Sequence, residues 1–182
     1  EPGWARKLLF TYDRKAIKAS KIRIKEWDYY LVLSDDFGLA LTVSDIGYIA
    51  LLSVSLLDFT APWEITNTVI KSFPMGKLNM PPSSETGDVR FSDKNLKIEY
   101  LVTKGERRLV CEHKKFKDGK PLTCDVRLSQ PDMDSMVIAT PWKEDEKAFY
   151  YNQKINCMPA DGFVNFDGKD YIFKPEKDFG TL

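Results

Sequence analysis

The stretch from residue 22 to residue 59 limits most strongly what this chain can fold into. It contains three apolar runs separated by the words SDDFG and SDIG, and these runs are rich in Tyr, Leu, Val and Ile. Such residues suit a pleated, half-buried surface. Each run is too short and too close to the next for a helix with its caps, so the stretch predicts three consecutive antiparallel strands.

The rest of the chain continues the pattern of short strands and turns. Apolar and polar residues alternate over 63–73, 96–102 and 122–128, and Asp118-Gly119 is a strong hairpin signal, because primed turns need positive φ. About ten strands without an amphipathic helix indicate a sandwich or a barrel. Consecutive hairpins favour a barrel, which also removes sheet edges. We therefore expect residues 1–182 to form one all-β antiparallel barrel module, with a long Pro- and Gly-containing surface loop at 74–87.

The composition of the chain argues against some kinds of binding partner and indicates a cellular compartment. The chain has 27 basic and 27 acidic residues, which argues against a protein that coats nucleic-acid phosphates. Its longest apolar run, 48–57, is about half of the roughly 20 residues that a membrane-spanning helix needs. The three cysteines cannot all pair, which suits free thiols in a reducing compartment such as the cytoplasm. The chain begins with Glu1 and shows no secretory signal, and a first residue other than Met is compatible with an upstream segment that has been removed.

An aromatic cluster surrounds one acidic residue in the first predicted strand. Trp27, Tyr29 and Tyr30 flank Asp28, and Tyr48 follows in the next turn. The cluster could be the wall of a cavity for an apolar ligand, with Asp28 as its polar anchor or acid. Alternatively, the aromatics are ordinary core residues. Asp28 would then face water in a β-bulge, which the change in phase of the alternation at this point predicts.

The hairpin at Asp118-Gly119 raises the question of a metal site. If Lys117 pairs with Lys120, then His113 faces Cys124, and Cys111 lies on the same face. Two thiols and an imidazole could bind a soft metal ion, but a closed structural zinc site wants a fourth ligand, and none is visible. The alternative is two small buried cysteines and an ordinary histidine. No cofactor is predicted.

Other catalytic patterns are missing from the sequence. There is neither a GxSxG nucleophile elbow nor a Gly-rich phosphate loop. The basic runs Arg107-Arg108 and His113-Lys114-Lys115 are interrupted by Glu106 and Glu112, which is typical of a solvated face.

Five short segments of the sequence resemble a known family. They are WARKLLF at 4–10, RIKEWDYYLV at 23–32, DDFGLALTVSDIGY at 35–48, LLSVSLLDF at 51–59 and DFGTL at 178–182. Together they resemble an uncharacterised bacterial family catalogued as domain of unknown function 2804, over nearly the whole chain. Members of that family are about twice as long, and their second half begins with a Trp-Gly-Arg-Gly word that is missing here. The resemblance therefore implies the amino-terminal half of a two-barrel protein.

The same family is distantly similar to hydroxyneurosporene synthase and to other lipocalin-like double-barrel proteins. This kinship implies a calycin-type barrel and, more weakly, apolar-ligand chemistry, because a fold does not fix a function. The first expectation is thus a lipocalin-like module that binds an apolar or lipid-like small molecule. The second is half of an enzyme of isoprenoid or lipid metabolism, a hydratase or isomerase with Asp28 as acid and Tyr29 or Tyr30 nearby. The third is a structural or interaction barrel without a ligand.

A module of a two-barrel protein is expected to expose an apolar face when it stands alone. Its partner would be the missing carboxy-terminal half or a second copy of the chain. The candidates for lining that face are three aromatics from the chain ends, Trp4, Phe10 and Phe179.

Overall fold

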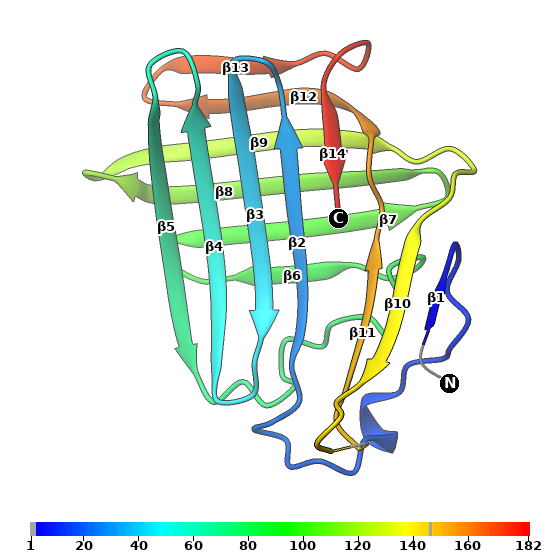
Figure 1. Cartoon of the computed structure of the whole chain (residues 1–182). Coiled ribbons are helices and arrows are strands. Elements are labelled where there is room, and N and C mark those ends of the chain that lie inside the picture. The colour runs from blue at the N-terminus through cyan, green and yellow to red at the C-terminus, as the bar shows by residue number, and fades with distance from the viewer. Residues whose placement is uncertain (1–2, 146) are drawn as a thin grey trace.

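The computed structural model describes residues 3–145 and 147–182, and one strongly curled antiparallel sheet dominates it (Figure 1). The predicted all-β class is confirmed, and the half-barrel that this sheet forms is consistent with the predicted lipocalin-like barrel. The one helical element among the described residues is a short 3-10 turn, Arg14–Ala16. No helix in this part of the chain has both the length and the apolar character needed to cross a bilayer.

Five strands of the large sheet form its front layer (Figure 1). Three of them are the strands predicted between residues 22 and 59. Four follow one another as hairpins, and a short strand from the end of the chain lies beside β2. They are β2 (Glu26–Leu33), β3 (Phe37–Asp45), β4 (Ile49–Asp58), β5 (Trp63–Ser72) and β14 (Phe179–Thr181).

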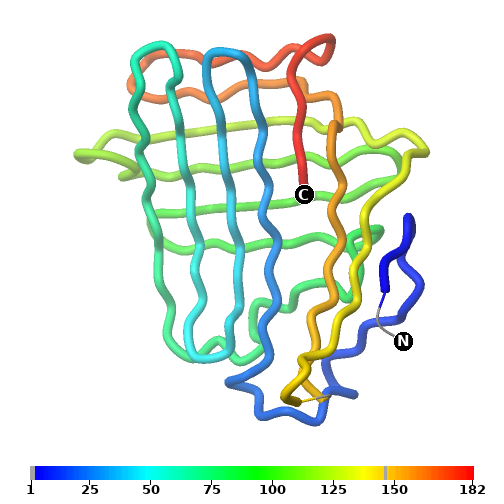
Figure 2. Tube along the Cα trace, viewed as in Figure 1, coloured from blue at the N-terminus to red at the C-terminus, as the bar shows by residue number. Residues whose placement is uncertain are grey.

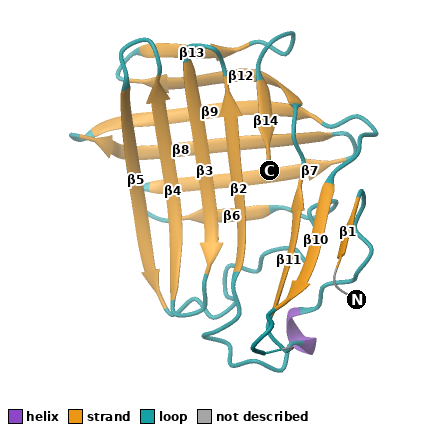
Figure 3. Ribbon diagram, viewed as in Figure 1, coloured by secondary structure: helices purple, strands orange, loops and turns teal. Residues whose placement is uncertain are grey.

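The back layer runs crosswise behind the front one, as Figure 3 shows. Its strands are β6 (Val89–Ser92), β7 (Leu96–Thr103), β8 (Glu106–Lys117), β9 (Lys120–Ser129), β12 (Met158–Phe166) and β13 (Lys169–Phe173). The strand order is β5-β4-β3-β2-β14-β12-β9-β8-β7-β6, with β13 on β12. Strands β5 and β6 are therefore the two ends of this path, and the predicted long loop joins them. We call residues 74–87 the strap.

A three-stranded sheet stands beside the half-barrel and carries the chain from β9 to β12. It consists of β1 (Gly3–Ala5), β10 (Met136–Pro141) and β11 (Phe149–Lys154), paired in the order β1-β10-β11. Its aromatics reach the front layer, since Trp27 and Tyr150 have ring centroids 5.9 Å apart.

The core fills the space between the two layers. Alternate residues of each strand point inward, as in β4, where Ala50, Leu52, Val54 and Leu56 are fully buried. Two hollows among the described residues are open to solvent. One of about 490 Å³ lies between β5 and the end of β8, and the other, of about 110 Å³, lies against Gly162. The burial of the apolar side chains between the two layers is the main source of the stability of the fold.

Two details of strand geometry differ from the sequence-based expectation. Strand β2 pairs with β3 without a break from Glu26 to Leu33, so the bulge predicted near Asp28 is wrong. The phase change arises because residues 22–25 precede the strand. A register shift occurs instead in β8, between His113 and Lys117. It lies next to the Asp118-Gly119 turn, where both residues have positive φ as predicted.

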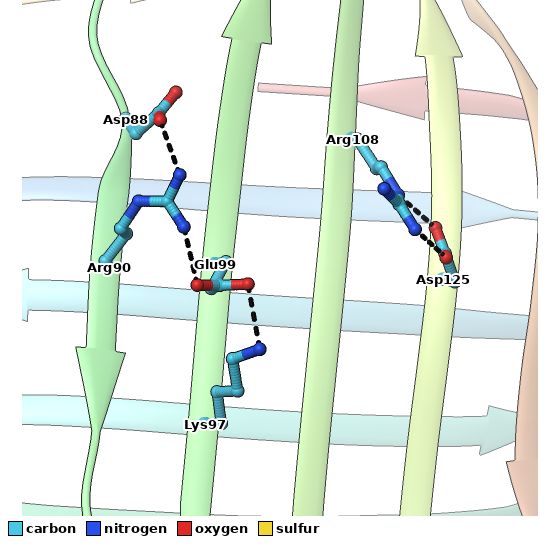
Figure 4. Close-up of polar contacts among 6 residues, drawn as sticks. All are labelled: Asp88, Arg90, Lys97, Glu99, Arg108 and Asp125. Carbon is cyan, nitrogen blue, oxygen red and sulfur yellow. Dashed lines mark hydrogen bonds and ion pairs between the residues drawn. The ribbon is translucent and has the colours of Figure 1, made fainter.

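The outer faces of the two layers have opposite character. Ion pairs cross the outer face of the back layer, where Arg90 contacts both Asp88 and Glu99, and Arg108 holds Asp125 (Figure 4). On the front layer, the register places Trp27, Tyr29, Leu31 and Leu33 of β2 outward, beside the small residues Ser44, Thr42, Ala40 and Gly38 of β3. We call the outward residues of β2, β3, β4 and β5 the front outer face.

Candidate functional site

A buried arginine lies at one end of the core. Arg107 of β8 is 1 % exposed, and its three hydrogen bonds all go to neutral groups. Its Nε donates to Oε1 of Gln130 (2.8 Å), its Nη1 to the hydroxyl of Tyr30 (3.1 Å) and its Nη2 to the carbonyl of Ser84 (2.6 Å). Buried guanidinium groups are normally paired with an anion, so this arrangement needs an explanation.

Two buried tyrosines from opposite layers meet in the core, and Tyr30 is the one that bonds this arginine. Tyr30 of β2 and Tyr100 of β7 are both 1 % exposed, and their rings meet edge to face with centroids 4.7 Å apart. Burial raises the pKa of Tyr30 to about 12 and that of Tyr100 well above its ordinary value, so both stay neutral. The Tyr100 hydroxyl is buried and has no hydrogen-bond partner among the described residues. It is a donor without an acceptor inside the core.

Asp28 is the acidic residue nearest to this group. It is partly buried on the inner side of β2, two residues before Tyr30. Burial raises its pKa from 3.8 to about 6, although the positive charge of Arg107 acts in the opposite direction. No ion pair within 4.0 Å joins Asp28 to Arg107 in the described part of the chain. A carboxyl group with this pKa can take up or release a proton near neutral pH.

The strap covers the arginine. Ser84 offers its carbonyl to Arg107 and its hydroxyl to Gln153 of β11. At the other end of the strap, Asp45 accepts a hydrogen bond from the backbone N–H of Gly76 (2.7 Å). Figure 2 shows the connection between β5 and β6 passing the lower ends of β2 and β3. We call Asp28, Tyr30, Ser84, Tyr100, Arg107 and Gln130 the Arg107 cluster.

The structure divides the aromatic cluster predicted from sequence. Tyr30 and Asp28 point toward the core, whereas Trp27 and Tyr29 lie on the front outer face and are about 40 % exposed. Tyr48 lies in the turn between β3 and β4 and is 47 % exposed. These residues therefore do not form one wall. Side chains that alternate along a strand point to opposite faces of the sheet.

The predicted Cys and His cluster is also rearranged. Lys117 does pair with Lys120, but the register shift in β8 places Cys111 opposite Cys124 and His113 opposite Leu122. The His113 ring then bonds Asn67 of β5, with Nε2 and Oδ1 3.0 Å apart. No group of three His, Cys, Asp or Glu side chains suited to a metal ion occurs among the described residues.

Sequence reasoning missed Arg107 by assigning it to a solvated face. The available signal was the alternation in β8, where Arg107 has the same phase as the buried Leu109 and Cys111. Its neighbour Arg108 has the opposite phase and pairs with Asp125 on the surface. His113, also predicted to be solvated, is buried on the same face as Arg107.

The predicted exposed aromatics are indeed exposed, but they do not form one surface. Trp4 is 73 %, Phe10 52 % and Phe179 43 % exposed. Phe179 pairs with Leu33 beside the front outer face. Trp4 belongs to β1, and the Phe10 ring meets Tyr151 of β11.

Comparison with known proteins gives a family and no function. No curated protein and no solved structure matches the chain. A family known as domain of unknown function (DUF2804) matches residues 1–182. The chain therefore belongs to this family.

Proposed function

We propose that the chain is a lipocalin-like binding module for an apolar or lipid-like small molecule, whose polar end binds at the Arg107 cluster. The observation that carries this proposal is unused hydrogen-bonding capacity inside the core. A guanidinium group has five N–H donors, and Arg107 uses three of them on described residues, while the Tyr100 hydroxyl uses none. Buried polar groups are normally satisfied, and exceptions call for an explanation such as a ligand.

The surroundings of the cluster support an apolar ligand body. Asp28 pairs across the sheet with Val43, and Tyr30 with Leu41. On the back layer Tyr100 pairs with Leu109, which is fully buried. A few polar groups among apolar side chains are typical of small-molecule sites. The ligand would enter where the strap now lies, and the strap would move to admit it.

Purified protein tests this proposal directly. We expect native mass spectrometry of the chain, purified without detergent, to show a bound small molecule that organic solvent extracts. Its skeleton should be mainly apolar. A chain that carries no ligand, and whose melting temperature does not respond to fatty acids, fatty alcohols or isoprenoid alcohols, would contradict the proposal.

A second candidate function is association with another copy of the chain through the front outer face. In this face Glu64 is the one charged residue among the outward positions of β2–β5, whereas ion pairs cover the back layer. Its hydroxyls also bond one another, Ser53 with Thr68 (2.8 Å) and Ser55 with Thr66 (2.6 Å). Such a face loses few hydrogen bonds to water when it is covered. Four strands of eight residues span about 19 by 27 Å, roughly 500 Å², which is the size of the largest patch on a typical monomer, and such patches are often functional.

Sedimentation at low and high concentration measures this association. We expect the wild-type chain to form a dimer as its concentration rises, and Ile70→Lys to keep it monomeric because the charge would be buried in the interface. Ile70 lies on the front outer face and is 60 % exposed. Ile172→Lys is the matched control, since Ile172 is 51 % exposed but belongs to β13 in the back layer. A wild-type monomer at every concentration would exclude the dimer.

A further inference from the structure

We infer that the polar end of the ligand is a carboxylate, bound by Arg107 and Tyr100 in place of the Ser84 carbonyl. This inference rests on the proposed small-molecule binding and specifies the chemistry of its polar end. It makes the ligand class an apolar carboxylic acid rather than an alcohol, an ester or a hydrocarbon.

The donors around the arginine favour an anion. Two N–H groups of Arg107 have no partner among the described residues, and the Ser84 carbonyl occupies a third on Nη2. A carboxylate accepts two parallel bonds from a guanidinium group, and charged hydrogen bonds are about twice as strong as neutral ones. An acid that displaces Ser84 would therefore exchange one neutral acceptor for a charged, bidentate one. An alcohol would offer a single neutral oxygen.

Tyr100 supplies a further donor of the right kind. Its hydroxyl is fully buried, stays protonated and has no acceptor among the described residues. Its ring contacts that of Tyr30, whose hydroxyl already bonds Arg107. A carboxylate on Arg107 would lie on the same side of the core and would accept this unused O–H. The ligand thus satisfies a buried hydroxyl that the free protein leaves without a partner among the described residues.

Asp28 is the acidic group that acts on Tyr30 and Tyr100, and the other titratable or charged groups around them are Arg107, Cys111 and Cys124. A second negative charge nearby disfavours ionisation of Asp28. Its pKa already lies at about 6, so a small further rise leaves it protonated near neutral pH. Asp28 then takes up a proton as the acid binds, and no pair of like charges remains buried.

Octanoate and 1-octanol, which have chains of equal length, separate the two proposals. We expect octanoate to bind at least tenfold more tightly than 1-octanol by titration calorimetry at pH 7, because only the acid brings a negative charge and two acceptor oxygens to the guanidinium group. Equal binding of both compounds would overturn the carboxylate inference and leave small-molecule binding in place. Binding of neither compound would overturn both.

Conservative variants test whether octanoate binds at the Arg107 cluster. Tyr100→Phe should weaken octanoate binding about tenfold, the value of one hydrogen bond to a charged group. It should leave 1-octanol binding unchanged. The same variant should not lower the melting temperature, because the hydroxyl has no partner in the free protein. Tyr29→Phe on the front outer face is the control. Unchanged octanoate binding in Tyr100→Phe would overturn the inference, even if Arg107→Gln failed to fold.

Discussion

Replacing Gly162 by alanine is expected to destabilise the protein by about 4 kcal/mol, the sum of an overpacking term and a backbone-strain term. Gly162 lies in the middle of β12 with φ +136°, and a Cβ atom would stand 2.1 Å from the carbonyl oxygen of Asp125. That oxygen belongs to the neighbouring strand β9, so neither backbone can move without breaking the ladder. Urea denaturation of both proteins gives the difference in unfolding free energy.

Gly168→Ala is the matched control for this variant. Gly168 also has positive φ, +77°, but a Cβ atom added there would meet no other atom within 4 Å. Its replacement should cost only the left-handed backbone conformation, about 1–2 kcal/mol. Equal losses in the two variants would show that the close approach to Asp125 contributes nothing.

Replacing Asp28 by asparagine is expected to stabilise the folded chain at neutral pH by about 3 kcal/mol, at 1.36 kcal/mol per pKa unit. The pKa of Asp28 is about 6 in the folded protein and 3.8 as the ordinary value. The folded state therefore binds this proton more tightly than the unfolded state does. The contribution of Asp28 to stability is greatest below pH 4 and is lost as the pH rises through 6. Asparagine, which carries no charge at any pH, avoids this loss.

Urea denaturation between pH 3.5 and pH 8 measures the effect. The variant and the wild type should have equal stability near pH 3.5 and should diverge between pH 4 and pH 7. Asp161→Asn, at an exposed position of β12, is the control and should show no such divergence. A constant difference across the range would mean that burial does not perturb Asp28. The same variant tests the enzyme hypothesis, since a hydratase or isomerase that keeps full activity in Asp28→Asn does not use Asp28 as its acid.

The strands of the front layer could be predicted because their alternation is regular and their turns carry strong signals. Which face of β2 is buried could not be predicted in the same way. The larger apolar side chains, Trp27, Tyr29 and Leu33, lie outside, while the inner face carries Asp28 and Tyr30. Size and hydrophobicity indicate the core only when the opposite face is polar. Here both faces are apolar, so tertiary packing decides.

The candidate site depends on contacts between the two layers, and the local sequence around each residue does not indicate such contacts. Arg107 and Tyr30 are 77 positions apart in the chain, and only the crossing of the two layers brings them together. The alternation in β8 indicates that Arg107 is buried, but nothing in the sequence names its partners. The register shift between His113 and Lys117 lies opposite Pro121 of β9, which cannot donate a ladder hydrogen bond. A proline does not fix the register by itself, and this shift changes which residue faces Cys124.

The position of β14 determines the order in which this fold can assemble. Strands β2–β5 and β6–β9 are hairpin series whose contacts are local, but the hydrogen-bonded ladder joins the two series only through β14 and β12. Strand β14 pairs with residues of β2 about 150 positions away. Such distant contacts form late and slow the folding rate. Until they form, the inner faces of both series are open to water. A nascent chain in this state would bind chaperones, and aggregation would compete with its folding at this step.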